Sequence, residues 1–484
     1  MEFVIASFVR LYGEYINALP LDDNLQLMVA APDRIPRAVL DEIPALADGI
    51  AALDDAVKWW NANHDRYAGS DRILRLHCLL SAVDRVLEAV GAVRFKEPGG
   101  ELAVGRPWWH CYLHQANARK RLRAGARTSV TSRPFANIRW LPAHPNRLKD
   151  AAFRKHLRGA LVKENDPTLR IGLCVLGCDA QAAFSLEPAM DRRHGVYGFR
   201  GTEVAWHGPA GESVASELIA CLKWAREARV HVLCFPELAV DMAGREVLAR
   251  ELEKDPGTIA LVVPGSFHQI ASDGPERVNR APAWLLGETG LSGEGGFDKT
   301  DPFNSGAAEF AELFQDIPED CVECKEDIRP GTGLTVIETP VGHFGIAICK
   351  DATNHTLIEG YGNAVDHLLV LSMNPRGTSV FWAQGGESIV RRHGASMVYV
   401  NSAQGIPKTD EGADLVFTYF PQHTGLRNRL YRYNVLGTAI ARAAGQPPPP
   451  SGTRHPERPA EIHCVPPNMR VLIEVPIPQT LLDT

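Results

Sequence analysis

The sequence predicts an α/β protein whose buried strands alternate with helices, preceded by a mainly helical segment. From residue 169 onward, short apolar runs rich in β-branched residues alternate with longer amphipathic stretches. Continuous apolar strands between helices are typical of sheets that are buried on both faces. Before residue 165, apolar residues recur instead at helical spacing, most clearly in the leucine and valine stripe over residues 74–90.

Length and composition agree with a globular protein of two domains. The chain has 484 residues, of which 45% are hydrophobic and 23% charged, and we place the domains at 1–165 and 166–484. The formal net charge of −7 excludes a generic nucleic-acid binder. The N-terminus lacks the pattern of a signal peptide, and no apolar run approaches the roughly 18–20 residues that cross a bilayer. We therefore expect a cytoplasmic protein with no membrane association.

The expected elements follow in chain order. Ser70 or Asp71 could cap the helix over 74–90, and the tryptophan pairs at 59–60 and 108–109 should pack in the core of the helical domain. In the α/β domain, helices are expected over 211–228 and 379–393, and strands over 169–176, 230–235, 259–263, 283–286, 334–338, 344–348, 367–372, 397–401, 435–442 and 469–476. The proline-rich stretch 446–459 should be a surface excursion before the last strand.

Three reactive side chains stand beside the ends of these strands. Glu237 follows Phe235 and Pro236, where the proline ends the strand ladder, Lys299 lies in the loop after strand 283–286, and Cys349 closes strand 344–348. Open α/β sheets build their sites at the carboxyl ends of strands. Each residue alone could be a helix cap, a solvated lysine or one more buried thiol among ten cysteines. The order Glu, Lys, Cys is much more specific than any one of them.

Motifs around these positions resemble those of the nitrilase, or carbon–nitrogen hydrolase, superfamily. The resemblance runs from about residue 169 to residue 476. The segments that carry it are 235–238, 264–266, Lys299, 345–351 with Cys349 and Asp351, 366–375, 391–394 and 400–405. It implies a four-layer αββα sandwich and, by analogy, a homodimer or larger assembly. It implies no metal and no organic cofactor.

The resemblance also implies a Glu-Lys-Cys triad, which elementary chemistry supports. A thiol with a pKa of about 8.5 is mostly protonated at neutral pH, so it needs a base or a positive neighbour. Glu237 would take the thiol proton and later activate water, and Lys299 would stabilise the oxyanion. Cys349 would form an acyl-thioester, which makes the chain an amidase-like hydrolase of non-peptide carbon–nitrogen bonds.

Further residues are expected in this site. Many family members carry a second glutamate after the lysine, for which Glu309 is preferred over Glu312. The backbone N–H of Lys350 could complete the oxyanion site, and Asn374 should line it. Lys350 departs from the aromatic residue that is common after the family's cysteine. Its side chain could favour an anionic substrate or lower the thiol pKa, or it could turn away and pair with an acid.

Two other signals stand outside this set. Cys321 and Cys324 have the spacing of a metal or redox pair, but no second pair stands at structural-zinc spacing, so no metal site is expected. Residues 119–158 hold twelve Lys or Arg and one Asp, a net charge of 12 − 1 = +11. This basic run could bind an anionic partner such as nucleic acid, or dock on an acidic surface of the α/β domain or of a partner subunit.

Three functions follow from these observations. The leading one is hydrolysis of a small-molecule amide, with the helical domain serving assembly or partner binding. A second is an effector or scaffold with weak or conditional activity, and a third is acyl transfer from the same thioester to an amine. Convergence of Glu237, Lys299 and Cys349 in the fold would favour the first over the second.

Overall fold

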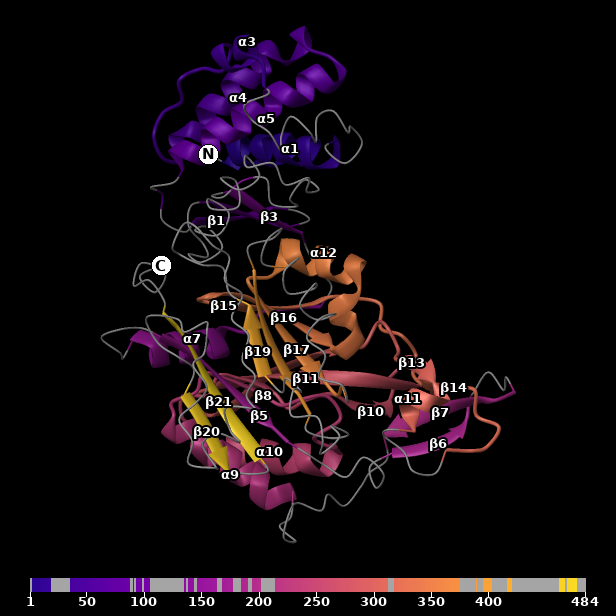
Figure 1. Ribbon diagram of the computed structural model, residues 1–484. Helices are drawn as coiled ribbons and strands as arrows, with labels where there is room; N and C mark the ends of the chain where they lie inside the picture. Colours follow the sequence, from indigo (N-terminus) through magenta and orange to yellow (C-terminus); the bar gives the residue numbers. More distant parts are fainter. Residues whose placement is uncertain are drawn as a thin grey trace, which may run out of the picture.

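The described part of the chain is a mixed α/β protein with a group of helices at its N-terminal end (Figure 1). The computed structural model describes residues 2–18, 35–87, 90, 93–97, 100–104, 135, 138–142, 146–162, 168–176, 184–189, 194–201, 214–311, 317–374, 389, 395–402, 416–419, 461–465 and 468–476. Within these ranges, no helix is both long and apolar enough to cross a lipid bilayer.

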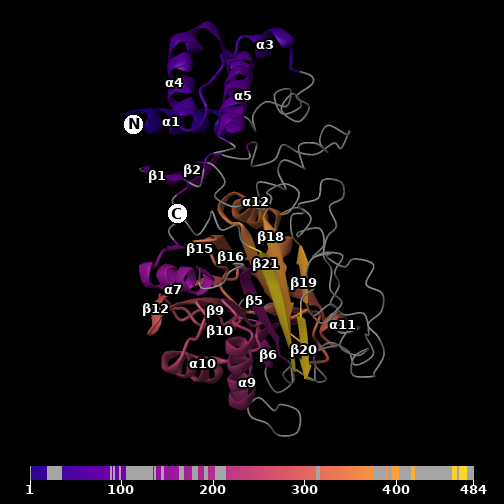
Figure 2. The same cartoon turned by 90° about the vertical axis from the view of Figure 1, so that its left-hand side faces the viewer.

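The N-terminal helices build an apolar core of their own. They group together above the sheets in Figures 1 and 2. They are α1 (Glu2–Ala18), α3 (Arg37–Asp41), α4 (Ala51–Asn63) and α5 (Gly69–Val86). Trp60 is buried in this core and Trp59 packs against it, as expected, whereas residues 108–109 lie outside the described part. The chain enters α5 at Gly69, whose φ of 53° suits glycine, and Ala68 is the N-cap. The expected cap at Ser70 or Asp71 is therefore wrong.

A small antiparallel sheet, which was not expected, completes this region. Its strands are β1 (Val93–Glu97), β2 (Gly100–Val104) and β3 (Ile138–Pro142), in the order β1-β2-β3. Leu102, Val104 and Ile138 enter the same core as the helices. The strands were not expected because their short sequences mix charged and apolar residues without a clear period.

Two large sheets form the body of the protein. The eight-stranded sheet runs β10-β11-β9-β8-β5-β21-β20, with β12 beside β11; its bounds are β5 (Thr168–Val175), β8 (Val232–Cys234), β9 (Leu261–Val263), β10 (Phe267–Ile270), β11 (Arg277–Gly287), β12 (Gly290–Asp298), β20 (Glu461–Val465) and β21 (Asn468–Pro476). The six-stranded sheet runs β19-β18-β17-β16-β15-β4; its bounds are β4 (Asn146–Leu148), β15 (Thr335–Thr339), β16 (Gly342–Ile348), β17 (His367–Ser372), β18 (Ser396–Asn401) and β19 (Val416–Tyr419).

Alternate residues of the eight-stranded sheet enter two different cores. On one face, Leu173 of β5 and Val232 of β8 share a large core with Ile346 of the six-stranded sheet. On the other face, Cys174 and Leu233 pack with helices α9 (Val214–Glu227) and α10 (Met242–Lys254). Successive side chains of a strand point to opposite faces. Both faces are therefore covered, which is why these strands read as continuous apolar runs.

Helix α12 (His355–Ala364) packs closely on the six-stranded sheet through a glycine of the nitrilase-like motif. The Tyr361 ring lies over Gly345, where an added Cβ would come within 2.6 Å of the ring. The Tyr361 hydroxyl donates to the carbonyl of Ile346. Gly345 is therefore needed so that α12 can approach the strand that ends at Cys349.

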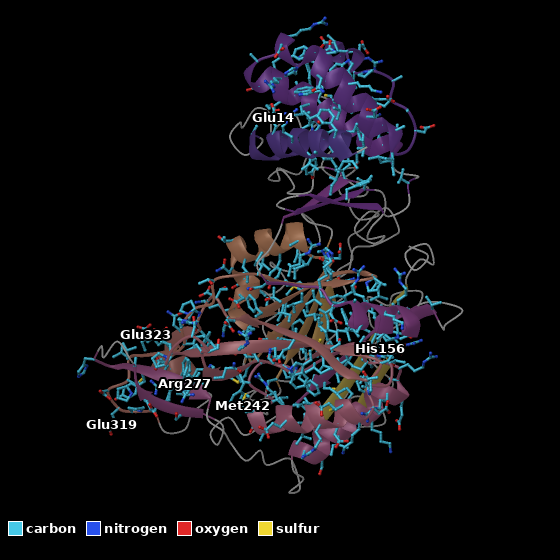
Figure 3. All side chains as sticks on the ribbon, turned by 180° about the vertical axis from the view of Figure 1, so that it is seen from behind. Glu14, His156, Met242, Arg277, Glu319 and Glu323 are labelled. Atoms are coloured by element: carbon cyan, nitrogen blue, oxygen red, sulfur yellow. The ribbon has the colours of Figure 1, made fainter. Side chains whose placement is uncertain are left out.

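Residues 146–162 pack on the two large sheets. Strand β4 pairs in parallel with β15, and helix α7 (Ala151–Val162), labelled at His156 in Figure 3, puts Phe153, Leu157 and Leu161 into the core shared by the two sheets. In the basic run, the Arg147 and Lys149 side chains both pair with the buried Glu338 of β15. These two residues thus dock on the α/β body, and residues 119–133 lie outside the described part.

A third, four-stranded sheet stands at the side of the body, in segments where no strand was expected. Its order is β13-β14-β7-β6, and its bounds are β6 (Phe184–Pro188), β7 (Val196–Gly201), β13 (Asn304–Gly306) and β14 (Glu323–Glu326). Figure 3 labels Glu323, where β14 begins, on the same side of the molecule as Arg277, where β11 begins. Phe199, Phe267, Phe310 and Cys324 form an apolar cluster between this sheet and β10.

Every strand expected within the described residues is present, with ends shifted by a few positions; for example, the strand expected over 283–286 is part of the longer β11. The helix expected over 211–228 is α9. The helix at 379–393, the strand at 435–442 and the proline-rich stretch 446–459 cannot be compared, because they fall almost entirely outside the described ranges.

Candidate active site

Glu237 is held at the end of β8 by groups from three other elements. After Pro236 the chain leaves the ladder, and Glu237 keeps a single bridge to Ser266. Its carboxylate is 2% exposed. Oε1 accepts hydrogen bonds from Lys299 Nζ at 2.9 Å and from Asn279 Nδ2 at 2.9 Å, and Oε2 accepts one from the backbone N–H of Met373 at 2.9 Å. The fold therefore fixes the position of this carboxylate.

Lys299 follows β12 and is buried between two carboxylates. Its backbone N–H donates to the carbonyl of Asn279 at 2.9 Å. Its Nζ lies 2.9 Å from Glu237 Oε1 and 2.6 Å from Glu326 Oε2. Burial alone would lower the pKa of Lys299, but the two carboxylates outweigh it and hold the pKa well above its usual value. Lys299 is therefore an ammonium ion at neutral pH.

Glu326, at the end of β14, is the second acid of this cluster. Its Oε1 accepts hydrogen bonds from Asn279 Nδ2 at 2.7 Å and from His268 Nε2 at 3.0 Å, and its Oε2 accepts one from the backbone N–H of Phe303 at 3.0 Å in addition to Lys299. Burial opposes ionisation, but Lys299 and the His268 hydrogen bond lower the pKa of Glu326 below its ordinary value. Glu326 is therefore a permanent anion.

The two glutamates have opposite tendencies. Burial raises the pKa of Glu237 against the effect of Lys299, and the negative charge of Glu326 raises it further. Two carboxylates whose environments push their pKa values apart can be assigned different roles. Glu237 is the one suited to accept and return a proton.

Cys349 is presented by a strained turn where β16 ends. It begins the short 3-10 turn Cys349–Thr353 with a φ of 47°, a left-handed conformation that costs an ordinary residue of this kind about 1–2 kcal/mol. The thiol is buried, and Ser372 Oγ donates to its sulfur at 3.4 Å. Burial, with Glu237 adding to it, raises the pKa of Cys349 to about 12, against Lys299 and the Ser372 bond. The resting thiol is therefore protonated and needs a base.

Asp351 ties the cysteine turn to the lysine loop. Its buried carboxylate accepts hydrogen bonds from the backbone N–H of Ile348, at 3.3 Å, and of Asp301, at 2.8 Å, and from the Thr300 hydroxyl at 2.6 Å. Residues on both sides of Cys349 and directly after Lys299 are thus held by one side chain. The aspartate of the nitrilase-like motif therefore fixes the lysine and the cysteine relative to each other.

The Lys350 side chain turns away and pairs with an acid, which was one of the expected alternatives. Its Nζ lies 3.0 Å from Asp301 Oδ1 and donates to Asn304 Oδ1 and to the carbonyl of Pro302, both at 3.3 Å. The Asp301 carboxylate therefore neutralises the positive charge of Lys350, which had been considered as a binding group for an anionic substrate. The side chain is about one third exposed, so the pair contributes little energy.

Replacing Lys350 by methionine is accordingly expected to change kcat/KM by less than about 3-fold, because partly exposed ion pairs of this kind are weak. The factor should be equal for neutral and anionic amides. Steady-state assays on a matched pair of substrates measure it, with Lys223→Met on α9 as a control for the loss of one positive charge. A selective loss on the anionic substrate would assign Lys350 to substrate binding instead.

Glu326 is the second acid in contact with Lys299 among the described side chains, and it was not expected in the site. Glu309 lies in α11 (Ala307–Phe310), but its side chain, like Glu312, is outside the described part. Asn374 follows β17, where its backbone N–H and carbonyl are both bonded to the Asn401 side chain; the residue before it, Met373, is the one that contacts Glu237.

Cys321 and Cys324 lie together outside the site. Their sulfurs are 3.4 Å apart. Among the described residues, no group of three or more His, Cys, Asp or Glu side chains is arranged to hold a metal ion.

No protein-family model and no curated protein matches the chain, but it is similar in part to solved structures. A double mutant of the amidase from Nesterenkonia sp. AN1 in complex with acrylamide is 14% identical, with 66% of this chain and 95% of that chain covered and a TM-score of 0.36. Nit3 from Saccharomyces cerevisiae, a member of branch 10 of the nitrilase superfamily, is 13% identical, with 60% and 97% covered and a TM-score of 0.34. The glutamine-dependent NAD+ synthetase from Acinetobacter baumannii is 15% identical, with 55% of this chain and 44% of that chain covered and a TM-score of 0.33. This chain therefore spans less than half of that one.

Proposed function

We propose that this chain is a carbon–nitrogen hydrolase of the nitrilase superfamily, an amidase that acts through an acyl-thioester on Cys349. The observation that carries the proposal is a single cluster of buried groups. The thiol of Cys349, at a strained position directly after a strand, lies near the ammonium of Lys299. Lys299 pairs with two carboxylates, Glu237, whose pKa is raised, and Glu326, whose pKa is lowered. Structural proteins have little reason to bury such charges, whereas nucleophilic catalysis needs them.

The residues divide the chemistry as follows. Glu237 takes the proton of Cys349, and the thiolate attacks the amide carbonyl carbon. The oxyanion forms near Lys299 and the backbone N–H of Lys350. As the tetrahedral intermediate collapses, the carbon–nitrogen bond breaks and Glu237 returns its proton to the leaving amine or ammonia. Glu237 then deprotonates water, which attacks the thioester, and the carboxylic acid and the Cys349 thiol are released.

The remaining parts of the proposal concern architecture. The core shared by the two large sheets, with α9 and α10 outside one sheet and α12 against the other, supports a four-layer αββα sandwich. The separate apolar core of α1, α3, α4 and α5 supports an N-terminal helical domain for assembly or partner binding. Homo-oligomerisation and a cytoplasmic location, where a thiol nucleophile stays reduced, complete the proposal.

The decisive test is detection of the covalent intermediate. The full-length protein is mixed with a panel of small primary amides, quenched in acid within seconds and measured by intact mass. We expect one acyl adduct, mapped by peptide mass spectrometry to Cys349, together with ammonia release. The Cys321→Ala variant, which removes a half-buried thiol outside the site, should form the adduct at the wild-type rate. Absence of both adduct and ammonia across the panel would leave the scaffold function as the better account.

A further inference from the structure

We propose that His268 is a positioning residue for this reaction. By donating a hydrogen bond to Glu326, it holds that carboxylate as an anion and leaves Glu237 as the proton acceptor for the Cys349 thiol. The inference rests on the proposed hydrolase function and adds a residue outside the Glu-Lys-Cys set.

Hydrogen bonds fix which nitrogen of His268 carries the proton. The backbone N–H of Gly201, at the end of β7, donates to Nδ1 at 2.7 Å, so Nδ1 must present its lone pair. Nε2 then bears the ring proton and donates it to Glu326 Oε1 at 3.0 Å. Phe199 also packs against the buried ring in a T-shaped arrangement, with centroids 5.4 Å apart and planes at 68°. His268 is therefore locked as a donor to Glu326.

His268 is the side chain that distinguishes the two glutamates. Asn279 and Lys299 each donate to both carboxylates, at 2.7 and 2.6 Å to Glu326 and at 2.9 Å to Glu237, so they differ between the two acids only in degree. Each acid also accepts one backbone N–H, from Met373 for Glu237 and from Phe303 for Glu326. The hydrogen bond from His268 goes to Glu326 only. A hydrogen bond to a carboxylate favours its charged form, so His268 is the side chain that stabilises the charge of Glu326 without also stabilising that of Glu237.

Because His268 stabilises the charge of Glu326 only, Glu237 is a stronger base than Glu326. Because Glu326 stays negative, it raises the proton affinity of its neighbour Glu237. If Glu326 took a proton instead, Glu237 would lose that effect, and the two acids would share the proton as a coupled pair. Among the described residues, the titratable groups facing Glu326 are Lys299, Glu237 and His268, with Cys349 beyond Lys299. Arg200, on β7, pairs with Asp327.

The variants separate the donor from the ring. His268→Leu removes the donor, and His268→Gln keeps an N–H at the position of Nε2. The matched control is His231→Leu: His231 is also buried and accepts a backbone N–H at Nδ1, from Arg170 at 3.0 Å, but its Nε2 meets no described partner. If His268→Leu does not fold, His268→Asn, which is too short to reach Glu326, takes its place.

Two quantities are measured as a function of pH. The first is kcat/KM on an amide that forms the adduct in the panel described above. The second is the rate at which iodoacetamide alkylates Cys349, a measurement that needs no substrate. His268→Leu should move the acid limb up by about one pH unit in both profiles, because the pair of acids takes up its first proton at a higher pH once Glu326 has lost this hydrogen bond. On the acid side of the limb kcat/KM should therefore fall about 10-fold, with KM unchanged. His268→Gln should stay within about 3-fold of wild type, and in a Glu326→Gln background His268→Leu should add nothing.

The outcomes distinguish the two proposals. An unmoved acid limb in both profiles, or an equal shift in His231→Leu, would overturn the role of His268 even if the wild type hydrolyses amides. A wild type that forms no adduct, with an alkylation limb that still moves in His268→Leu alone, would overturn the hydrolase function while supporting His268 as the residue that sets the charge of Glu326.

Discussion

Replacing Lys299 by methionine is expected to abolish most activity and to destabilise the folded protein at the same time. Methionine fills a similar volume but leaves Glu237 and Glu326 facing each other without the ammonium between them. Breaking a buried ion pair by removing one partner costs about 3–5 kcal/mol. Loss of an oxyanion-stabilising group lowers kcat by about 10²- to 10³-fold. Urea unfolding and steady-state assays measure the two effects separately.

The stability loss should depend on pH in a defined direction. Without Lys299, the pKa values of Glu237 and Glu326 in the folded protein rise above those of the unfolded chain. A group whose folded-state pKa is raised stabilises the protein at low pH, and this stability is lost as pH rises through the folded-state pKa. The difference in unfolding free energy between wild type and Lys299→Met should therefore be larger at about pH 8 than at about pH 5.

A double variant separates the structural role of Lys299 from its catalytic role. Lys299→Met with Glu326→Gln leaves one buried carboxylate in place of two, so it should recover part of the stability and none of the activity. Lys254→Met, which breaks an exposed pair with Glu251 on α10, should leave both readouts unchanged. Activity within about 10-fold of wild type in Lys299→Met would remove Lys299 from the oxyanion site.

The central strands could be predicted because a strand that is buried on both faces has an almost continuous run of apolar residues in the sequence. Strands β5, β9, β16 and β17 are apolar along almost their whole length, since each face lies in a core. The strands β6, β7, β13 and β14 have no such signal. In β14, half-buried and buried positions alternate over only four residues, and its parallel partner β7 lies far away in the chain, so no strand was expected there.

The same difference explains which site residues the sequence could reveal. Glu237 and Cys349 follow apolar strands, so each could be recognised from its own local sequence. Lys299 was expected in a loop, but it directly follows β12, a glycine-rich and partly exposed strand that the sequence did not predict. Glu326 enters the site because β14 pairs in parallel with β7, in a register that sets Glu326 opposite Phe199. That register is a property of the folded sheet. His268 and Asn279 are inward-facing polar residues of β10 and β11, and nothing in their local pattern distinguishes them from outward-facing ones.

Replacing Cys349 is expected to reduce turnover to background whichever residue takes its place, because no other described thiol lies in the site. The effect on stability should depend on the replacement. At a φ of 47°, alanine keeps the strain of a left-handed residue, about 1–2 kcal/mol, whereas glycine loses it and pays about 0.5–1 kcal/mol of backbone entropy. Cys349→Gly should therefore be more stable than Cys349→Ala by about 0.5–1 kcal/mol in urea unfolding.

The matched control is the same pair of substitutions at Cys234, a buried cysteine in β8 with ordinary strand geometry. There alanine should be the more stable replacement by about 0.5–1 kcal/mol, because only the entropy of glycine differs. Opposite signs at the two positions would show that the fold stores strain at Cys349 and not at Cys234, as expected of a thiol held near Glu237 and Lys299. The same sign at both would mean that the turn is relaxed and that the thiol position is set by packing.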